Sequence, residues 1–130
     1  MKRWFMIVGL GAMVTVGVHE AFAGFKENNP VQVDLPSRTA AGSIGATRRT
    51  TDNVQYIGCT VAGDQNGNTV SCFARTANST SLFCQTTSPF LVQAAAALSG
   101  DAYLSFSVDV SGRCNRLLVN QDSSNDVKSH

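Results

Sequence analysis

The four cysteines of this 130-residue chain constrain its fold more than any other feature of the sequence. They are Cys59, Cys72, Cys84 and Cys114, and no two of them form a C-x-x-C motif. No histidine lies between residues 23 and 130, so we expect no metal centre built from Cys and His ligands. An even number of cysteines in a small chain outside the cytosol indicates disulfides, and we predict two of them.

The pairing of these cysteines is left open by their spacing, because four cysteines can join in three ways. We prefer Cys72–Cys84, which ties neighbouring strands across a short turn, together with Cys59–Cys114. The alternative, Cys59–Cys72 with Cys84–Cys114, is nearly as well supported. A symmetric turn at 64–68 would set Cys59 directly across from Cys72.

The first 23 residues have the pattern of a cleavable signal peptide. Lys2 and Arg3 precede an uncharged stretch, and the segment ends in the small-x-small pattern Ala21-Phe22-Ala23 that signal peptidases cleave. The apolar run is about 15 residues long, whereas a membrane-spanning helix needs roughly 20. We therefore predict a secreted or periplasmic protein that has no stable membrane insertion after cleavage.

Charge also limits the classes of partner. Cleavage would remove Lys2, Arg3 and Glu20, which leaves equal numbers of acidic and basic residues. A chain without net positive charge has no evident patch for phosphate groups, so we do not expect nucleic acid as the partner. The expected partner is an extracellular or envelope macromolecule.

The chain after the signal peptide divides into three parts by composition. Residues 24–42 are polar, contain two prolines and few large apolar side chains, and predict a flexible N-terminal arm, with a short edge strand as the alternative. Residues 43–120 carry the cysteines and most apolar residues and predict one disulfide-linked domain. Residues 121–130 are polar and predict a disordered tail.

Within the central domain, residue patterns predict six elements. Strand signals cover 54–61, 70–75 and 82–84, with turn residues at 63–68 and 78–80. A helix is predicted over 88–98, with a hydroxyl cap from Thr87 or Ser88, Pro89 in the first turn and a left-handed cap at Gly100. A final hairpin gives the order β-β-β-α-β-β. The expected fold is α+β, a small antiparallel sheet with one helix packed on a face.

The last hairpin allows a prediction of register. A two-residue loop at Ser111-Gly112 sets Phe106 opposite Leu117 and Leu104 opposite Val119, so that apolar residues face each other. The same register points Cys114 away from that face, beside Asp109. A loop one residue longer swaps the faces, and the sequence leaves this choice open.

Catalytic chemistry finds little support in the sequence. His19 belongs to the signal peptide, His130 ends the chain, and no serine lies in a G-x-S-x-G motif, so a catalytic triad is not expected. The alternative to a non-enzymatic module is a small secreted hydrolase or toxin that uses carboxylates. Clustering of Asp52, Asp101 and Asp109 in a cleft would favour that alternative.

Three residues are candidates for binding a partner. Arg48 and Arg49 form a basic pair in a polar stretch, as a protease inhibitor would present, and the simpler interpretation is two solvated arginines. Phe73 is out of phase with Val70, Cys72 and Ala74, so it faces the other side of its strand. There it is either packed on a second layer or exposed to a ligand. We predict an exported, non-enzymatic binding module, with protease inhibition as one version.

Several short runs are similar to a group of small exported bacterial proteins with the same layout of cysteines. The runs are Gln55-Tyr56-Ile57-Gly58-Cys59, Cys72-x-Ala74-Arg75, Cys84, Pro89-x-Leu91-Val92, Tyr103-Leu104-Ser105-Phe106 and Gly112-x-Cys114. The resemblance covers about residues 43 to 120. It implies export and a disulfide-linked domain, and it carries over no active site.

The signal-peptide prediction can be checked directly on the exported protein. We expect its N-terminal residue to be Gly24, because cleavage follows Ala23 in the small-x-small pattern. Intact-mass measurement and N-terminal sequencing of the protein from the periplasm or medium would test this. A protein that retains Met1 in the cytosol, with four free thiols, would contradict it.

Overall fold

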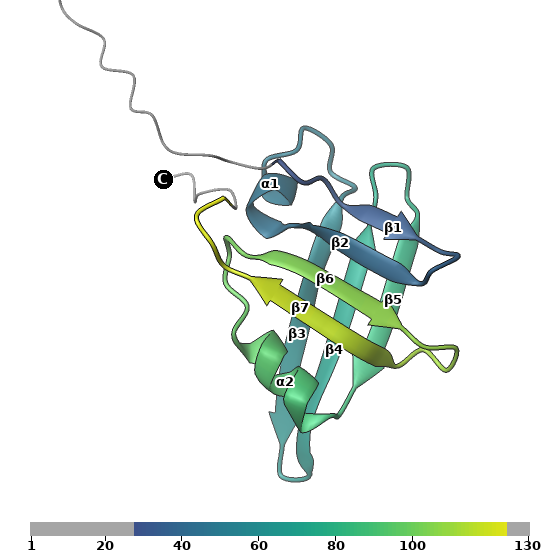
Figure 1. Cartoon of the computed structure of the whole chain (residues 1–130), viewed down its shortest axis with the longest axis vertical. Coiled ribbons are helices and arrows are strands. Elements are labelled where there is room, and N and C mark those ends of the chain that lie inside the picture. The colour runs from purple at the N-terminus through teal and green to yellow at the C-terminus, as the bar shows by residue number, and fades with distance from the viewer. Residues whose placement is uncertain (1–27, 125–130) are drawn as a thin grey trace, which may run out of the picture.

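Residues 28–124 are described by a computed structural model, in which they form two antiparallel sheets and two short helices (Figure 1). The signal-peptide prediction and part of the tail prediction concern residues outside this range. One sheet has the order β1-β2-β6-β7 and the other the order β3-β4-β5. The strands of the first sheet are β1 (Gln32–Asp34), β2 (Thr39–Ser43), β6 (Tyr103–Val108) and β7 (Cys114–Asn120). Those of the second are β3 (Tyr56–Asp64), β4 (Gly67–Arg75) and β5 (Ser81–Thr86), while α1 (Ile44–Arg48) follows β2 and α2 (Pro89–Ala96) follows β5.

The hydrophobic core lies between the two sheets. Figure 1 shows the four-stranded sheet crossing in front of the three-stranded one, and α2 contacts β3, β4 and β7. Both sheets and α2 supply buried side chains to one cluster: Val31, Ala40, Leu104, Phe106, Val108 and Cys114 from one side, Ile57, Val70, Cys72, Ala74 and Cys84 from the other, and Val92 and Ala95 from α2. The small size of most of these side chains means that the core is thin.

The prediction of a single sheet with one helix on its face is wrong, because the strands form two sheets that pack against each other. The antiparallel sheets, a helix between β5 and β6, and the two disulfides are present. However, β1, β2 and α1 precede the predicted elements, and the seven strands of the described chain divide into two sheets. The face of β3-β4-β5 that was expected to receive mainly a helix is instead covered largely by the second sheet.

The predicted flexible arm over 24–42 is wrong for its second part. Residues 32–34 and 39–43 are strands, and β2 lies between β1 and β6, with Ala40 opposite Phe106. The sequence of β2, TAAGS, contains no large apolar side chain, so apolar periodicity gives no strand signal there. Backbone hydrogen bonds to both neighbouring strands, and the close packing that small residues allow, stabilise the segment instead.

The β3-β4-β5 meander has the predicted order of strands, but β3 and β4 extend into the predicted turn at 63–68, so that only residues 65–66 lie between them. The β3–β4 register places Asp64 opposite Gly67 and Cys59 opposite Cys72. The β4–β5 register places Cys72 opposite Cys84. Three cysteines therefore lie in one row across the sheet, on the face turned toward the core.

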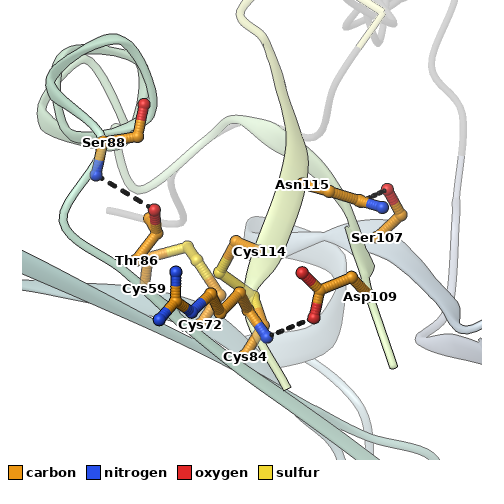
Figure 2. Close-up of a disulfide and its surroundings, with 10 residues drawn as sticks. Cys59, Cys72, Cys84, Thr86, Ser88, Ser107, Asp109, Cys114 and Asn115 are labelled. Atoms are coloured by element: carbon orange, nitrogen blue, oxygen red, sulfur yellow. Dashed lines mark hydrogen bonds between the residues drawn. A yellow bond between two sulfur atoms is a disulfide. The ribbon is translucent and has the colours of Figure 1, made fainter. Parts of the chain in front are cut away.

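The disulfides are Cys59–Cys72 and Cys84–Cys114, so the preferred pairing is wrong and the alternative is the one found. The Cα atoms of Cys59 and Cys72 are 4.0 Å apart, which marks a close, non-hydrogen-bonded pair of residues on antiparallel strands. Because the N–H and C=O of a residue point to the same side of its strand, Cys72 forms the wider type of pair with Cys84. Cys84 is thus left for Cys114, which joins the two sheets (Figure 2).

The β6–β7 hairpin has the longer of the two possible loops at its tip. Farther along the strands, a β-bulge restores the register that the two-residue loop predicted. Its tip is closed by the Asp109 N–H, which donates to the Arg113 carbonyl, and Gly112 has a left-handed φ of 80° in the loop. Val108 then lies opposite Cys114, whereas Ser107 lies opposite Arg116, so Asn115 is an extra residue in a β-bulge. Beyond the bulge, the predicted pairs Phe106–Leu117 and Leu104–Val119 are confirmed.

Because of this bulge, the predicted orientation of Cys114 is wrong. Without it, Cys114 would lie beside Asp109 and point away from the core. The extra residue reverses the alternation of side chains, so Cys114 is buried on the same face as Phe106 and Val108. The inter-sheet disulfide therefore depends on the bulge.

Helix α2 is confirmed in position and is shorter than predicted. It covers Pro89–Ala96, buries Val92 and Ala95, and has no side-chain cap from Ser88. The Thr86 hydroxyl instead accepts a hydrogen bond from the Ser88 N–H at 3.1 Å (Figure 2). The helix ends at Ala97 in a right-handed conformation, so Gly100 is not its left-handed cap. Over residues 28–124, no helix is long and apolar enough to cross a membrane.

Phe106 is the largest fully buried side chain of the described residues, and its removal tests the two-sheet core. We expect Phe106→Ala to lower the free energy of unfolding by about 3–5 kcal/mol, because a buried ring is lost and a cavity remains. Phe90→Ala is the matched control, since Phe90 is 83% exposed, and we expect a change within about 0.5 kcal/mol. Urea denaturation of the oxidised proteins would measure both, and equal losses would contradict the core described here.

Candidate functional site

The side of the β3-β4-β5 sheet that faces away from the core is the candidate site. Burial alternates along β4, where Val70, Cys72 and Ala74 are buried and the residues between them are only partly buried. We call the opposite side of these strands the outer face. Where all three strands lie side by side, its positions are Tyr56, Gly58 and Thr60 on β3, Ser71, Phe73 and Arg75 on β4, and Ser81, Phe83 and Gln85 on β5.

Aromatic side chains gather at one end of the outer face. The ring centroids of Tyr56 and Phe73 are 5.5 Å apart with a tilted geometry, and the Arg75 guanidinium carbon lies 5.4 Å from the Phe73 centroid. Phe83 is directly opposite Phe73 in the register. Tyr56 is 49% exposed and Phe83 is 51% exposed, so large parts of both rings contact solvent. The cluster is apolar and carries one positive charge.

Gly58 lies beneath the Tyr56 side chain. A Cβ atom at Gly58 would approach the Tyr56 Oη to 3.3 Å, which is tighter than ordinary contact. Gly58 is also the register partner of Phe73. The absence of a side chain there leaves room for the Tyr56 side chain to extend over Gly58 and reach the Phe73 ring.

Of the predicted binding residues, Phe73 alone lies in this cluster. Its ring packs against Tyr56 and Arg75 of the same sheet face, and the second sheet lies on the opposite side, so the predicted packing on a second layer is not what is found. Binding of a ligand by Phe73 stays a prediction. The importance of Tyr56, Arg75 and Phe83 was not predicted. The signal was present, because the predicted turns place all of them on the same side of their strands as Phe73.

Arg48 and Arg49 lie at the end of α1, where both are exposed. Arg48 is the last helical residue, and the Arg49 N–H is directed at the carbonyls of Ala46 and Thr47. Positive side chains at this end of a helix interact favourably with its dipole. The helical backbone is not the extended conformation in which a protease binds a polypeptide.

The three carboxylates considered for a hydrolase lie on three different loops. Asp52 follows α1, Asp101 precedes β6, and Asp109 begins the β6–β7 turn. Asp109 is engaged locally, since its Oδ1 accepts hydrogen bonds from the N–H groups of Ser111 and Arg113 at 2.8 and 2.9 Å. Among residues 28–124, the close group of potential metal ligands is Cys72, Cys84 and Cys114, which are all in disulfides.

Asp52 has a structural role. Its Oδ1 accepts hydrogen bonds from the N–H groups of Gln55 and Val54, and its Oδ2 accepts one from the Gln55 side chain. The backbone hydrogen bond from Gln55, followed by the bonds from its side chain and from Val54, lowers the pKa of Asp52 from 3.8 to about 2. The Gln55 Oε1 in turn accepts the Val31 N–H at 3.2 Å, which links the start of β3 to the segment before β1.

An open groove lies between the β3–β4 turn and the start of α2. It has a volume of about 750 Å³ and is lined by both polar and apolar groups, with Asp64 as the charged residue. A neighbouring groove shares Thr69 and Thr87 with it and includes Arg113. Neither groove brings together an acid, a base and a nucleophile, so we do not assign the candidate site to them.

Comparisons with known proteins found no matching family model, no matching curated protein and no matching solved structure. The resemblance to small exported bacterial proteins therefore stays a prediction. The fold and surface place the chain in a general class, a small disulfide-linked domain of two antiparallel sheets with an exposed aromatic face.

The hydrogen bonds to Asp52 predict a specific pH dependence. A carboxylate with a lowered pKa in the folded protein contributes stability above its unfolded pKa, and this contribution is lost as the pH falls through about 2. We expect the free energy of unfolding to fall between about pH 4 and pH 2, and Asp52→Asn to reduce that fall. Urea denaturation across this pH range would measure it. The same slope in both proteins would contradict the role assigned to Asp52.

Proposed function

We propose that this chain is an exported, non-enzymatic binding module that contacts an extracellular or envelope protein through its outer face. The observation that carries the proposal is the exposed cluster of Tyr56, Phe73, Arg75 and Phe83 on a sheet whose other side forms the core. Scattered exposed apolar residues need no explanation, but a contiguous group of exposed aromatic residues is typical of an interaction surface.

The composition of the outer face supports a protein as the partner. Its nine positions in the three-stranded part include three aromatic residues and one arginine, and no Asp, Glu or Lys; Asp64 lies farther along β3, at the turn. The cores of protein–protein interfaces are enriched in aromatic residues and Arg and depleted in Lys, Glu and Asp. Residues whose truncation strongly weakens binding are drawn mainly from Trp, Tyr and Arg. The single arginine also gives little basis for nucleic acid binding.

The outer face is also held in place before any partner arrives. Phe73 is fixed between the Tyr56 ring and the Arg75 guanidinium, and the Arg75 Nε donates to the Ser81 hydroxyl at 3.4 Å. These residues lie on hydrogen-bonded strands and not on loops. Side chains that are already ordered lose less conformational entropy on binding, which favours affinity.

Export is supported by the disulfides. Both bridges require an oxidising environment, and disulfides of this kind are rare in the cytosol and common in secreted or periplasmic proteins. The predicted signal peptide at residues 1–23 points to the same compartments. The partner should therefore be accessible from the periplasm or the medium.

The hydrolase alternative is less well supported, because its three carboxylates lie on separate loops and Asp52 and Asp109 are engaged by backbone N–H groups. The inhibitor version of the binding proposal is also less well supported, since Arg48 is helical and Arg49 follows directly. We therefore propose the outer face, and not the arginine pair, as the contact surface.

Site-specific crosslinking in cells that export the protein would test this proposal. The photoreactive analogue p-benzoylphenylalanine would replace Phe83 on the outer face. In a separate protein it would replace Phe90, which is the same residue type, 83% exposed, and lies on α2. We expect a defined crosslinked protein from position 83 and none of the same mass from position 90.

A second substitution would then test the cluster itself. Tyr56→Ala should weaken binding to the crosslinked protein, once purified, by about 2 kcal/mol or roughly 30-fold, because an interface aromatic anchor is lost. Isothermal titration calorimetry would measure the change. Equal crosslinking from positions 83 and 90, or an unchanged affinity in Tyr56→Ala, would contradict a binding role for the outer face.

A further inference from the structure

The arrangement of the cysteines contains more than two isolated bridges. Cys59, Cys72 and Cys84 lie in one row across β3, β4 and β5, because each is the register partner of the next. Cys114 faces this row from β7 on the other sheet and is bonded to Cys84. The central residue of the row, Cys72, therefore has a cysteine directly opposite on each neighbouring strand.

The sulfur atoms at the centre of this group are close together. The Sγ atoms of Cys72, Cys84 and Cys114 all lie within 4.8 Å of one another, although Cys72 is bonded to none of the other two (Figure 2). Cys72 and Cys84 are fully buried and Cys114 is 5% exposed, whereas Cys59 is only partly buried. An external thiol thus has its most direct access at Cys59.

We propose that Cys72 is the relay of an internal thiol–disulfide exchange that moves a reducing event from Cys59 to the bridge between the sheets. When Cys59–Cys72 is reduced, the Cys72 thiolate lies next to the remaining disulfide. It attacks Cys84, and the new bridge is Cys72–Cys84. The thiol of Cys114 is released, so the two sheets lose their covalent link.

The electrons and protons balance with one dithiol reductant. The dithiol attacks the Cys59 sulfur, breaks the Cys59–Cys72 bond and closes to its own cyclic disulfide, which leaves two cysteine thiols. The Cys72 thiolate then forms a bond to Cys84 while the Cys84–Cys114 bond breaks, and Cys114 takes the proton that Cys72 gave up. This second step is an exchange with no net oxidation or reduction.

The backbone geometry accommodates the product. Cys72 and Cys84 are directly opposite in the wider type of antiparallel pair, in which Cα atoms are about 5.5 Å apart, and disulfides usually span about 4.4–6.8 Å. No strand needs to change its register. What changes is the corner where β5 meets β7, which is otherwise held by the Gln85–Arg113 bridge and by the Gln85 N–H donating to the Gly112 carbonyl at 3.2 Å.

Two matched variants separate this proposal from a general loss of stability. Cys59→Ser and Cys72→Ser remove the same bridge, but the first leaves a thiol at Cys72 and the second leaves one at Cys59. Each oxidised protein would be held under folding conditions, quenched with acid, alkylated with N-ethylmaleimide and mapped as non-reduced peptides. We expect Cys59→Ser to lose part of its Cys84–Cys114 peptide and to gain Cys72–Cys84 with alkylated Cys114.

The Cys72→Ser protein should retain Cys84–Cys114 with alkylation at Cys59 alone, since the Cys59 sulfur is not part of the close group. A Cys59→Ser protein that keeps Cys84–Cys114 intact, with alkylation confined to Cys72, would overturn the proposal. The matched design assigns any difference to the position of the free thiol.

If both variants give every pairing because they do not fold, the wild-type protein decides the question. Folded protein would be treated with less than one equivalent of dithiothreitol and mapped in the same way. Cys72–Cys84 with alkylated Cys59 and Cys114 would support the relay. Alkylated Cys59 and Cys72 with an intact Cys84–Cys114 bridge would overturn it.

Discussion

The covalent link between Cys84 and Cys114 is the interaction on which the two-sheet arrangement depends most. The core between the sheets is built mainly from small residues, and Phe106 and Leu104 are its two largest fully buried side chains. A domain of this size with a core of mostly small side chains needs additional stabilisation, which disulfides supply. The β-bulge at Asn115 is what turns Cys114 toward Cys84. A single inserted residue thus makes the inter-sheet link possible.

The same arrangement explains why an interaction surface exists. The four-stranded sheet and α2 lie over one side of β3-β4-β5, which leaves the other side to solvent. Residues with core character on that side cannot be explained by packing between the sheets. Tyr56 and Phe83 are half exposed on this side, and Tyr56 is accommodated by the missing side chain of Gly58. Apolar area that the fold does not need for its core is available for a partner.

Local patterns in the sequence predicted the local structure well. The turn residues at 63–68 give the β3–β4 register, and the alternation of Leu104 and Phe106 gives most of the β6–β7 register. The partner sheet was not predictable in this way, because β2 contains only small and polar residues and is stabilised by its neighbours. The registers were enough to predict that Tyr56, Phe73 and Phe83 lie on the same side of their sheet. Whether another layer covers that side depends on where the second sheet packs. That is a long-range property with no local signal.

The pairing of the cysteines illustrates a different kind of ambiguity. The sequence left two pairings nearly equal because Cys72 could be placed opposite either Cys59 or Cys84, and in the structure it is opposite both. What decides between them is backbone geometry, since Cys72 forms a close pair with Cys59, and the availability of Cys114 for Cys84. In the folded protein, with Cys72 bonded to Cys59, the Sγ atom of Cys84 still lies within 4.8 Å of the Cys72 Sγ atom. The uncertainty in the sequence therefore corresponds to a physical alternative in the folded protein, and the proposed exchange is the reaction that connects the two pairings.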